Sequence, residues 1–343
     1  MRILVLGGTR FLGRAVVDDA AGRGWSVTVF NRGSSGPAPE RCEAVQGDRR
    51  NVADLARLAG HGPWDVVVDV PGVIPAEVRD AARVLAPLAG RYVFVSTVSA
   101  YQDWPAQPVD EGSPRRAGDP DVDVASWDWG AGVYGIYKAG AEAAVERETD
   151  GQALIIRPGV ILGPWEYSGR LTWWLERIAA GGRFVAPGDP GTRIQPVDVR
   201  DVAAFVLDHA AAASTGVFNL AAPLDRDTFG GLIDACLAAT GAAGAPVWVT
   251  DAQLQAADLR EWTQPPLWRT ATGTWQVDPS RALAAGFAPR PLADTVRDTW
   301  AWMQDGGEPF EDPRAAMHAI PVAIERVLLA TAADAASLAS GAK

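Results

Sequence analysis

The chain begins with MRILVLGGTRFLGRAVV, residues 1–17, in which a short apolar run is followed at once by a glycine-rich turn. This order predicts a buried strand, a tight turn and the start of a helix, which together place backbone N–H groups under a dinucleotide pyrophosphate. Gly7 suits the tight turn, and Gly13 allows the helix to lie close to the sheet. Arg10 stands where such turns usually carry a middle glycine. We therefore predict a phosphate-binding turn that contains an unusual arginine.

Length and composition indicate a globular protein without a nucleic-acid or membrane partner. The 343 residues, 48% of them hydrophobic, are enough for one large domain or two modest ones. A net charge of -11 offers no basic surface for nucleic acid or anionic lipid. No apolar run is long enough for a signal peptide or a membrane span. The 2 cysteines, Cys42 and Cys236, fit no disulfide scaffold or metal site, which favours a cytoplasmic protein without a bound metal.

Strand and helix patterns alternate along the first half of the chain. Short apolar runs follow one another at residues 2–6, 26–30, 43–46, 65–70, 91–96 and 152–157. Helical patterns with short connections separate most of them, which implies a parallel sheet with right-handed crossovers. We therefore predict an α/β fold with a Rossmann doubly wound parallel sheet and a smaller C-terminal substrate-binding lobe.

The pattern also suggests how the chain is divided. We expect residues 1–158 to form the dinucleotide-binding Rossmann domain, to which residues 192–222 return. Residues 159–303 should form mainly the substrate-binding lobe, and residues 304–343 a helical C-terminal tail that docks, mediates dimerisation or frays.

The stretch 102–130 interrupts the alternation with many Pro, Asp and Gly residues. Trp104, Trp127 and Trp129 lie near its ends. Because it falls near the carboxyl ends of the predicted strands, it is either a lid over the active site or a passive surface loop.

A tyrosine and a lysine carry the most specific chemical signal. Tyr134 and Lys138 are four residues apart in a predicted helix, so their side chains project from one face. A phenol has an ordinary pKa of about 10, and a nearby ammonium lowers it by favouring the phenolate. Tyr134 could then exchange a proton with a substrate hydroxyl while a hydride moves. Hydroxyls at Thr97 and Ser99 follow a predicted central strand and could hold the substrate oxygen, or could only satisfy the backbone of a turn.

Taken together, these motifs resemble the extended short-chain dehydrogenase/reductase family. The similarity covers most of residues 1–303 and excludes the tail. The motifs that carry it are Gly7 to Gly13, Val95-Ser96-Thr97 with Tyr101, Tyr134-Gly135 with Lys138 and Glu142, Arg157-Pro158-Gly159 with Gly163-Pro164, Asp278 with Ser280-Arg281, and Gly286-Phe287 with Pro289.

The resemblance implies a role for each candidate residue. Thr97, with Ser96 as the close alternative, is the catalytic hydroxyl, Tyr134 is the acid/base, and Lys138 holds the nicotinamide ribose. Asp48 would contact adenine, and Pro158 would lie near the carboxamide. The full set of expected cofactor contacts is Gly7, Thr9, Arg10, Phe11, Leu12, Gly13, Asn31, Arg32, Asp48, Val70, Pro71, Gly72, Ser96, Lys138 and Pro158. The expected substrate contacts are Ser99, Trp165, Trp173, Asp198 and Arg200.

The end of the second predicted strand bears on the cofactor type. An NAD-preferring fold usually has an acidic residue there, to bind the ribose 2′-OH. This chain has Asn31 and Arg32 instead. Arg32 could grip a 2′-phosphate, and Arg10 could reach the same group. The sequence therefore favours NADP over NAD.

The resemblance and the motifs together predict an NADP(H)-dependent oxidoreductase that acts on a carbonyl or hydroxyl of a small metabolite. Val98-Ser99 stands where sugar-nucleotide dehydratases carry Asp-Glu, and Arg157-Pro158-Gly159 where epimerases usually show Phe-Asn. An epimerase that retains NAD stays an alternative. So does a non-catalytic dinucleotide-binding or RNA-associated protein, since the turn also resembles that of chloroplast stem-loop RNA-binding relatives. Relatives often dimerise through two helices of the first domain, so a homodimer is also expected.

Overall fold

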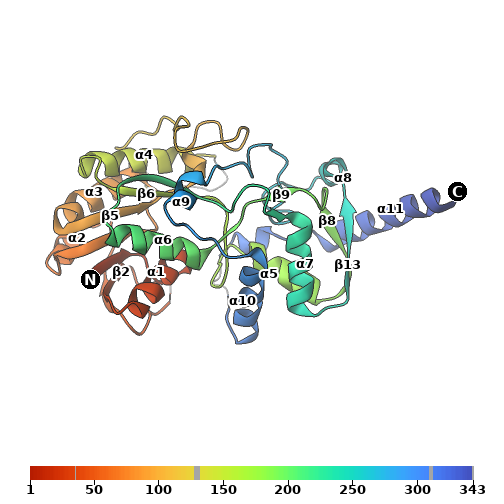
Figure 1. The fold of residues 1–343 in the computed structure, drawn as a ribbon, viewed down its shortest axis with the longest axis horizontal. Coiled ribbons are helices and arrows are strands. Elements are labelled where there is room, and N and C mark those ends of the chain that lie inside the picture. Colours follow the sequence, from red (N-terminus) through yellow and green to blue (C-terminus); the bar gives the residue numbers. More distant parts are fainter. Residues whose placement is uncertain (35, 127–131, 309–311, 342–343) are drawn as a thin grey trace. The chain divides into compact units, whose positions relative to one another are not determined.

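A computed structural model of the chain describes residues 1–34, 36–126, 132–308 and 312–341 (Figure 1). Trp127 and Trp129 of the interrupting stretch lie outside these described residues. The chain divides into two compact units. The first comprises Met1–Ile161, Pro196–Pro223 and Thr272–Pro289, and the second comprises Leu162–Gln195, Leu224–Ala271 and Arg290–Lys343.

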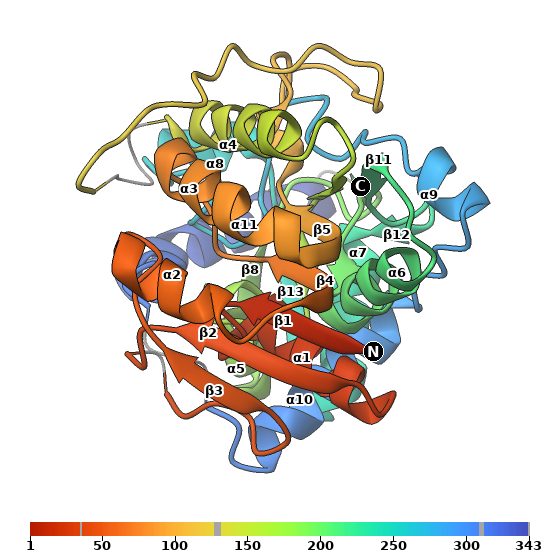
Figure 2. The ribbon, with the colours of Figure 1, turned by 90° about the vertical axis from the view of Figure 1, so that its left-hand side faces the viewer.

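A seven-stranded sheet with the order β11-β6-β5-β4-β1-β2-β3 forms the centre of the first unit. Every neighbouring pair in it is parallel. From β1, the strands β2 and β3 extend the sheet on one side, and β4, β5, β6 and β11 extend it on the other (Figure 2). The strands are β1 (Arg2–Leu6), β2 (Ser26–Asn31), β3 (Glu43–Gln46), β4 (Trp64–Asp69), β5 (Ala89–Val95), β6 (Leu154–Pro158) and β11 (Gly216–Leu220). This confirms the predicted doubly wound α/β fold.

Helices cover both faces of this sheet. The helices α2 (Val52–Ala59), α3 (Pro75–Leu85) and α4 (Tyr134–Glu148) lie on one face, and α1 (Phe11–Gly22) and α6 (Val199–Ala211) on the other (Figure 2). A continuous apolar core fills the space under α2, α3 and α4. It exists because inward-facing strand residues such as Leu4, Val67 and Phe94 meet the apolar stripe of each helix.

The segment Thr272–Pro289 returns to the first unit, although the sequence pattern placed it in the second lobe. It carries the short helix α9 (Ser280–Ala284). Val109 donates its backbone N–H to Gln276 O at 3.0 Å, and Asp278 donates to Val109 O at 2.8 Å. These bonds join stretches that are far apart in sequence, and a local hydrophobic pattern cannot predict such a pairing.

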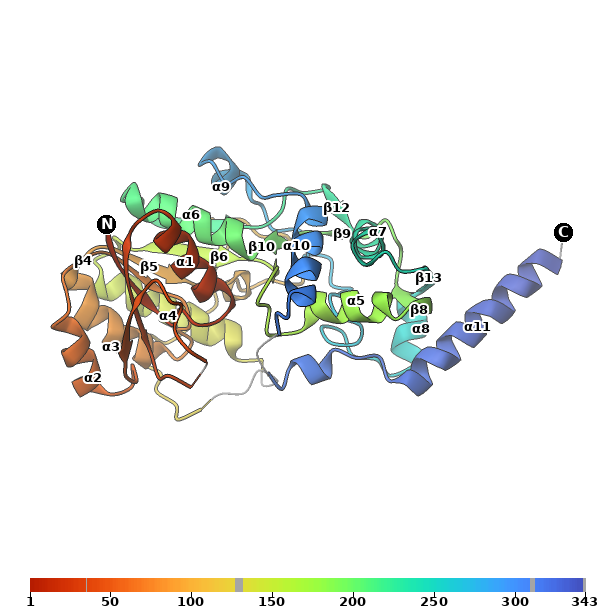
Figure 3. The same cartoon turned by 90° about the horizontal axis from the view of Figure 1, so that it is seen from below.

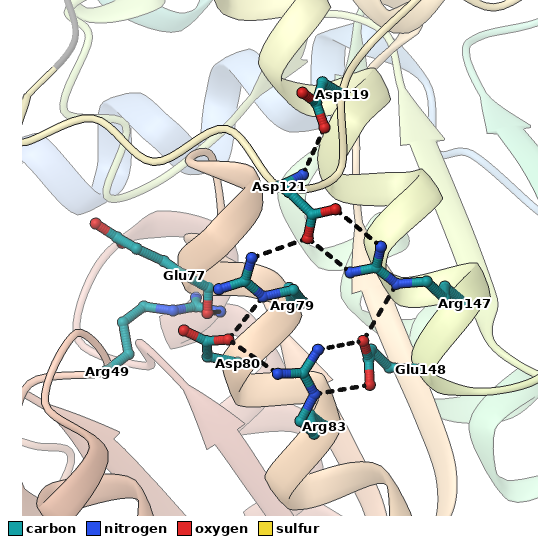
Figure 4. Close-up of polar contacts among 9 residues, drawn as sticks. All are labelled: Arg49, Glu77, Arg79, Asp80, Arg83, Asp119, Asp121, Arg147 and Glu148. Carbon is teal, nitrogen blue, oxygen red and sulfur yellow. Dashed lines mark hydrogen bonds and ion pairs between the residues drawn. The ribbon is translucent and has the colours of Figure 1, made fainter.

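The interrupting stretch is held against the outer face of α3 and α4 over its described part. Asp121 accepts hydrogen bonds from Arg79 at 2.9 Å and from Arg147 at 2.9 and 3.0 Å (Figure 4). Ala76 at the start of α3 donates to Val122 O at 3.0 Å. A Cβ at Gly118 would overlap the backbone of α4, so the stretch touches the helix directly. These contacts give the described part a structural role.

The second unit contains two small sheets and the remaining helices. Strand β13 (Gly244–Val249) is parallel to β8 (Gly182–Pro187), and β12 (Asp227–Thr228) is antiparallel to β9 (Arg193–Ile194). The helices are α5 (Arg170–Ala179), α7 (Phe229–Thr240), α8 (Asp251–Ala256), α10 (Leu292–Gln304) and α11 (Val322–Gly341). The short strands β7 (Ile161–Leu162) and β10 (Val197–Asp198) occur where the chain leaves and re-enters the first unit.

The first half of α11 docks on this unit. Glu325 accepts from Arg177 Nε at 3.0 Å and from the Val185 N–H at 3.2 Å. Leu328 and Ile320 are buried in an apolar cluster with Val185. The helix then continues past α8 toward the C-terminus (Figure 3). In the described part of the chain, none of the helices is both long and apolar enough to cross a membrane.

Candidate active site

The glycine-rich turn requires glycine at more positions than the motif alone suggests. Gly7 and Gly8 have φ angles of 94° and 92°, which side chains rarely adopt. A Cβ on Gly8 would lie 2.9 Å from Val29 Cγ1, and a Cβ on Gly13 would lie 2.7 Å from Gly8 N. The turn is therefore pressed between β2 and α1. Arg10 occupies the position before α1 and makes no side-chain cap to the helix, which fits a helix N-terminus that receives an anion.

The carboxyl ends of β2 and β3 form the next part of the edge. Asn31 Oδ1 accepts from the Gly33 N–H at 2.7 Å, which turns the chain sharply after β2. Arg32 is exposed there, while Asp48 accepts from the Arg50 N–H at 3.0 Å. A pocket opens beside this turn, lined by Asn31, Gly33, Gly36, Pro37, Ala38, Ala44, Val45 and Gln46. The expected residues for the adenosine end of a dinucleotide thus lie along one edge of the sheet.

Lys138 is buried, with 2% of its surface exposed. Its Nζ donates to Gly72 O at 2.7 Å and to Val95 O at 2.5 Å, and it lies 4.3 Å from the centre of the Phe94 ring. Burial lowers the pKa of Lys138 to about 7, although the negative charges of Asp69 and Glu142 act to raise it. The lysine predicted from the sequence therefore reaches the carboxyl ends of β4 and β5.

The rarity of lysine in this chain is a further signal, independent of the motifs. The sequence contains 31 cationic residues, and its two lysines are Lys138 and Lys343, so arginine supplies nearly all of the positive charge. A compact ammonium whose pKa shifts on burial differs from a guanidinium, which stays charged. A buried lysine in such a composition therefore points to lysine-specific chemistry.

The start of α4 lies against the segment that carries the predicted hydroxyls, and the contact is made at Gly135. Helix α4 begins at Tyr134, and a Cβ on Gly135 would overlap Ser99 O, so the first turn of α4 lies directly on the short helix Val98–Ala100. Thr97 Oγ1 accepts from the Ser99 N–H at 3.1 Å and lies 3.3 Å from Ser99 Oγ. Tyr134 is half-buried at this junction, one helical turn before Lys138.

A buried ion pair fixes α4 to β6. Arg157 donates to the two carboxylate oxygens of Glu142 at 2.8 and 2.5 Å, and Arg115 donates to Glu142 Oε2 at 3.1 Å. Burial alone would raise the pKa of Glu142, but the bonds from Arg157 hold it below its usual value. The Arg157 guanidinium also lies 4.5 Å from the centre of the Tyr101 ring. The family-like residues Glu142 and Arg157 therefore position the helix that carries Tyr134 and Lys138.

The residues expected to contact the substrate are distributed over both units. In the first unit, Asp198 is buried, precedes α6 as its N-cap, and accepts from the N–H and the guanidinium of Arg200. In the second unit, Trp173 packs edge-on against Trp174, with ring centres 4.9 Å apart. Trp165 is 38% exposed, and its ring centre lies 5.4 Å from that of Trp302. Asp198, Arg200 and Trp173 thus have local structural contacts, while Trp165 presents an aromatic surface.

The sequence of the first unit identifies the family to which the chain belongs. The model of the NAD dependent epimerase/dehydratase family matches residues 3–221, which include the glycine-rich turn, Tyr134 and Lys138. The chain belongs to this family. The match confirms the resemblance to extended short-chain dehydrogenase/reductases and supports an enzyme of that type with a nicotinamide dinucleotide cofactor.

Individual relatives of this epimerase/dehydratase family protein are distant. The chloroplast stem-loop binding protein of 41 kDa b from Arabidopsis thaliana is 27% identical over an alignment of 261 residues, which covers 70% of this chain and 63% of that protein. The solved structure of the enzyme WbmH from Bordetella bronchiseptica with NAD+ has a TM-score of 0.69 at 18% identity, covering 90% of this chain and 99% of that one. A UDP-glucose 4-epimerase from Thermotoga maritima has a TM-score of 0.64 at 21% identity, covering 90% and 100%.

The second unit of this family member contains a buried arginine, Arg269, that none of the sequence motifs includes. Arg269 is buried, lies 3.5 Å from the centre of the Trp262 ring, and donates to the carbonyls of Trp268 and Trp262 at 2.6 and 3.2 Å. Among the described residues, no carboxylate forms an ion pair with it. Burial lowers the pKa of the nearby His318 to about 4. The Arg269 guanidinium is thus held by two backbone carbonyls and the face of an aromatic ring.

Proposed function

We propose that this protein transfers a hydride between a nicotinamide dinucleotide and a hydroxyl-bearing carbon of a small metabolite. The observation that carries the proposal is the buried Lys138, whose ammonium bonds Gly72 O and Val95 O one helical turn after Tyr134. An ammonium has three donors, so one remains for a ribose hydroxyl. The turn around Gly8 and Gly13, too crowded for side chains, fits the pyrophosphate of such a cofactor.

Each of the chain's own groups has a defined task in this proposal. The dinucleotide, when bound, accepts or supplies the hydride. Tyr134 takes the proton from the substrate hydroxyl in oxidation and returns it to the carbonyl oxygen in reduction. Lys138, when protonated, favours the Tyr134 phenolate by charge. Thr97, or its neighbour Ser96, donates a hydrogen bond to the substrate oxygen, and Ser99 lies within reach of Thr97 to orient it.

Hydride transfer can end in net oxidation or reduction of the substrate, or in its epimerisation. We infer a net oxidoreductase, because the chain lacks the Asp-Glu pair of dehydratases and the Phe-Asn pair of epimerases. An epimerase that returns the hydride to the same substrate is the second candidate, favoured by the family match and by solved relatives named as UDP-glucose 4-epimerases. A stem-loop-binding role, suggested by the name of the Arabidopsis protein, conflicts with the net charge of -11.

A substrate panel followed at 340 nm distinguishes these outcomes. The purified protein is incubated with NADPH or NADH and carbonyl metabolites, or with the oxidised cofactors and hydroxyl metabolites, including UDP-sugars. Stoichiometric change in the reduced nicotinamide supports a net oxidoreductase. Interconversion of two epimers without a change in the reduced nicotinamide would contradict a net oxidoreductase and support the epimerase. If the protein binds the dinucleotide but converts no member of the panel under either test, the hydride-transfer proposal is contradicted in favour of a binding protein.

We further propose that NADP is the preferred cofactor, because of Arg10 and Arg32. The double variant Arg10→Gly, Arg32→Asp should lower the affinity for NADPH about 10–100-fold relative to NADH, since charge-assisted bonds to a phosphate contribute about 1.5–3 kcal/mol. Dissociation constants from tryptophan fluorescence quenching measure this ratio. Arg41→Gly, an exposed arginine in the loop before β3, serves as the charge control. An unchanged NADPH-to-NADH ratio in the double variant would refute the assignment.

A further inference from the structure

A buried ion pair joins the end of β4 to the turn after β3. Asp69, the last residue of β4, has no exposed surface. Arg49 donates to its two carboxylate oxygens at 2.8 and 2.7 Å, and the Tyr92 hydroxyl donates to Oδ2 at 3.3 Å. Arg49 also donates to the carbonyl of Glu77 in α3 at 3.3 Å, beside which it is drawn in Figure 4. None of the sequence motifs included this pair.

The pair lies next to the loop that holds Lys138. Gly72 follows Asp69 by three residues, and a Cβ placed on Gly72 would be 3.1 Å from Asp69 Oδ1. The carbonyl of the same Gly72 accepts from Lys138 Nζ at 2.7 Å. A single residue of backbone therefore separates the Asp69 carboxylate from the Lys138 ammonium. Any change in the charge of the pair acts on Lys138 through a short, water-poor path.

Among the described residues, three charged groups on the surrounding elements act on the charge of Lys138. Asp69 lies on β4 and Glu142 on α4, and both act to raise the pKa of Lys138, whereas Arg49 acts to lower it. Glu142 is already compensated by its bonds to Arg157 and Arg115. Asp69 is compensated by Arg49. The balance of charge at the ammonium is thus set by one carboxylate and by the arginine that neutralises it.

We propose that Arg49 and Asp69 are positioning residues that set the charge of Lys138 and, through it, the ionisation of Tyr134. The inference rests on the proposed function for its link to Tyr134, while its effect on Lys138 stands without turnover. Removing Arg49 exposes Lys138 to an uncompensated negative charge. Removing Asp69 exposes it to an uncompensated positive charge. The two single variants should therefore act in opposite directions.

The composition of the chain makes the test direct. Selective ¹³Cε-lysine labelling gives two NMR signals, from Lys138 and from Lys343, and the latter serves as the reference. Titration of the full chain should give a raised Lys138 pKa in Arg49→Met and a lowered one in Asp69→Asn, each by about 1–3 pH units. The double variant Arg49→Met, Asp69→Asn should return toward the wild-type value. Equal Lys138 titration in wild type and both single variants, or shifts of both in the same direction, overturns the proposal.

Matched variants separate charge from packing and guard against loss of folding. Arg49→Lys keeps the positive charge and should leave Lys138 close to its wild-type titration, whereas a packing role would make it resemble Arg49→Met. This comparison does not require Asp69→Asn, the variant most at risk of unfolding, and equal titration of the two Arg49 variants overturns the proposal. Arg83→Met removes an exposed arginine of the network in Figure 4 and should not move the signal.

The rate readout then tests the link to the reaction. If Lys138 must be protonated, the alkaline limb of the pH–rate profile should follow its NMR titration, upward in Arg49→Met and downward in Asp69→Asn. A shift in the NMR titration with no turnover on any substrate would contradict the proposed function and leave the pairing inference intact. Turnover with an unchanged Lys138 titration in the variants would contradict the inference on Arg49 and Asp69 and leave the proposed function intact.

Discussion

Tyr134→Phe is expected to lower kcat by about 10²–10⁴-fold, because under the proposed function it removes the group that exchanges a proton with the substrate hydroxyl. Tyr134 begins α4 beside Ser99, and Lys138 follows one turn later with its ammonium at the carboxyl ends of the central strands. The phenyl ring keeps the shape of the side chain, so dinucleotide affinity should stay unchanged. Steady-state rates and fluorescence titrations with NADPH and NADH measure the two quantities separately.

Tyr137 provides the matched control. It lies three residues further along the same helix and is half-buried like Tyr134, but no motif assigns it a role. Tyr137→Phe should therefore retain most of the wild-type rate. If the two variants lose activity to the same extent, the effect belongs to the stability of α4, and Tyr134 is not the acid/base. If neither variant loses activity, another group moves the proton.

Local motifs were sufficient to predict the family and the doubly wound fold of the first unit. The glycine-rich turn and the Tyr134–Lys138 spacing are short-range signals, since each is defined within one turn or one helix. The structure adds why Gly8 and Gly135 are glycines, because in both cases the obstacle comes from another element. Gly8 faces Val29 of β2, and Gly135 faces the backbone of Ser99. The motif shows that glycine stands at these positions, but only the structure shows which neighbouring atoms exclude a side chain.

Pairings between distant residues could not be predicted in the same way. Arg49 and Asp69 lie at the two ends of the crossover from β3 through α2 to β4, 20 residues apart, and β3 and β4 are not neighbours in the sheet. Arg115 reaches Glu142 only because the interrupting stretch folds back onto α4. The return of Thr272–Pro289 to the first unit likewise depends on backbone bonds to Val109. Each of these follows from topology, which hydrophobic periodicity does not encode.

Arg157→Met is expected to lower the free energy of unfolding by about 3–5 kcal/mol at neutral pH, because it removes the main ion-pair partner of the buried Glu142 carboxylate and leaves Arg115 at 3.1 Å as the remaining cation paired with it among the described residues. Methionine retains the apolar contact with Tyr101 but not the two hydrogen bonds. Chemical denaturation measures the change. Arg147→Met is the control, since Arg147 belongs to the exposed ion network of Figure 4 and its loss should matter little. Equal destabilisation by the two variants would contradict the role given to Glu142.

The pH dependence of this difference gives a second, independent check. In the wild type the pKa of Glu142 is held below its usual value, so its contribution is present above about pH 4.3 and is lost as the pH falls through the folded-state pKa. In Arg157→Met, burial without the main partner should raise that pKa instead. The variant then gains stability relative to the wild type as the carboxyl takes up a proton. The difference in unfolding free energy should therefore be smaller at pH 4.5 than at pH 7.5, and a difference that stays constant would show that packing, rather than charge, is lost.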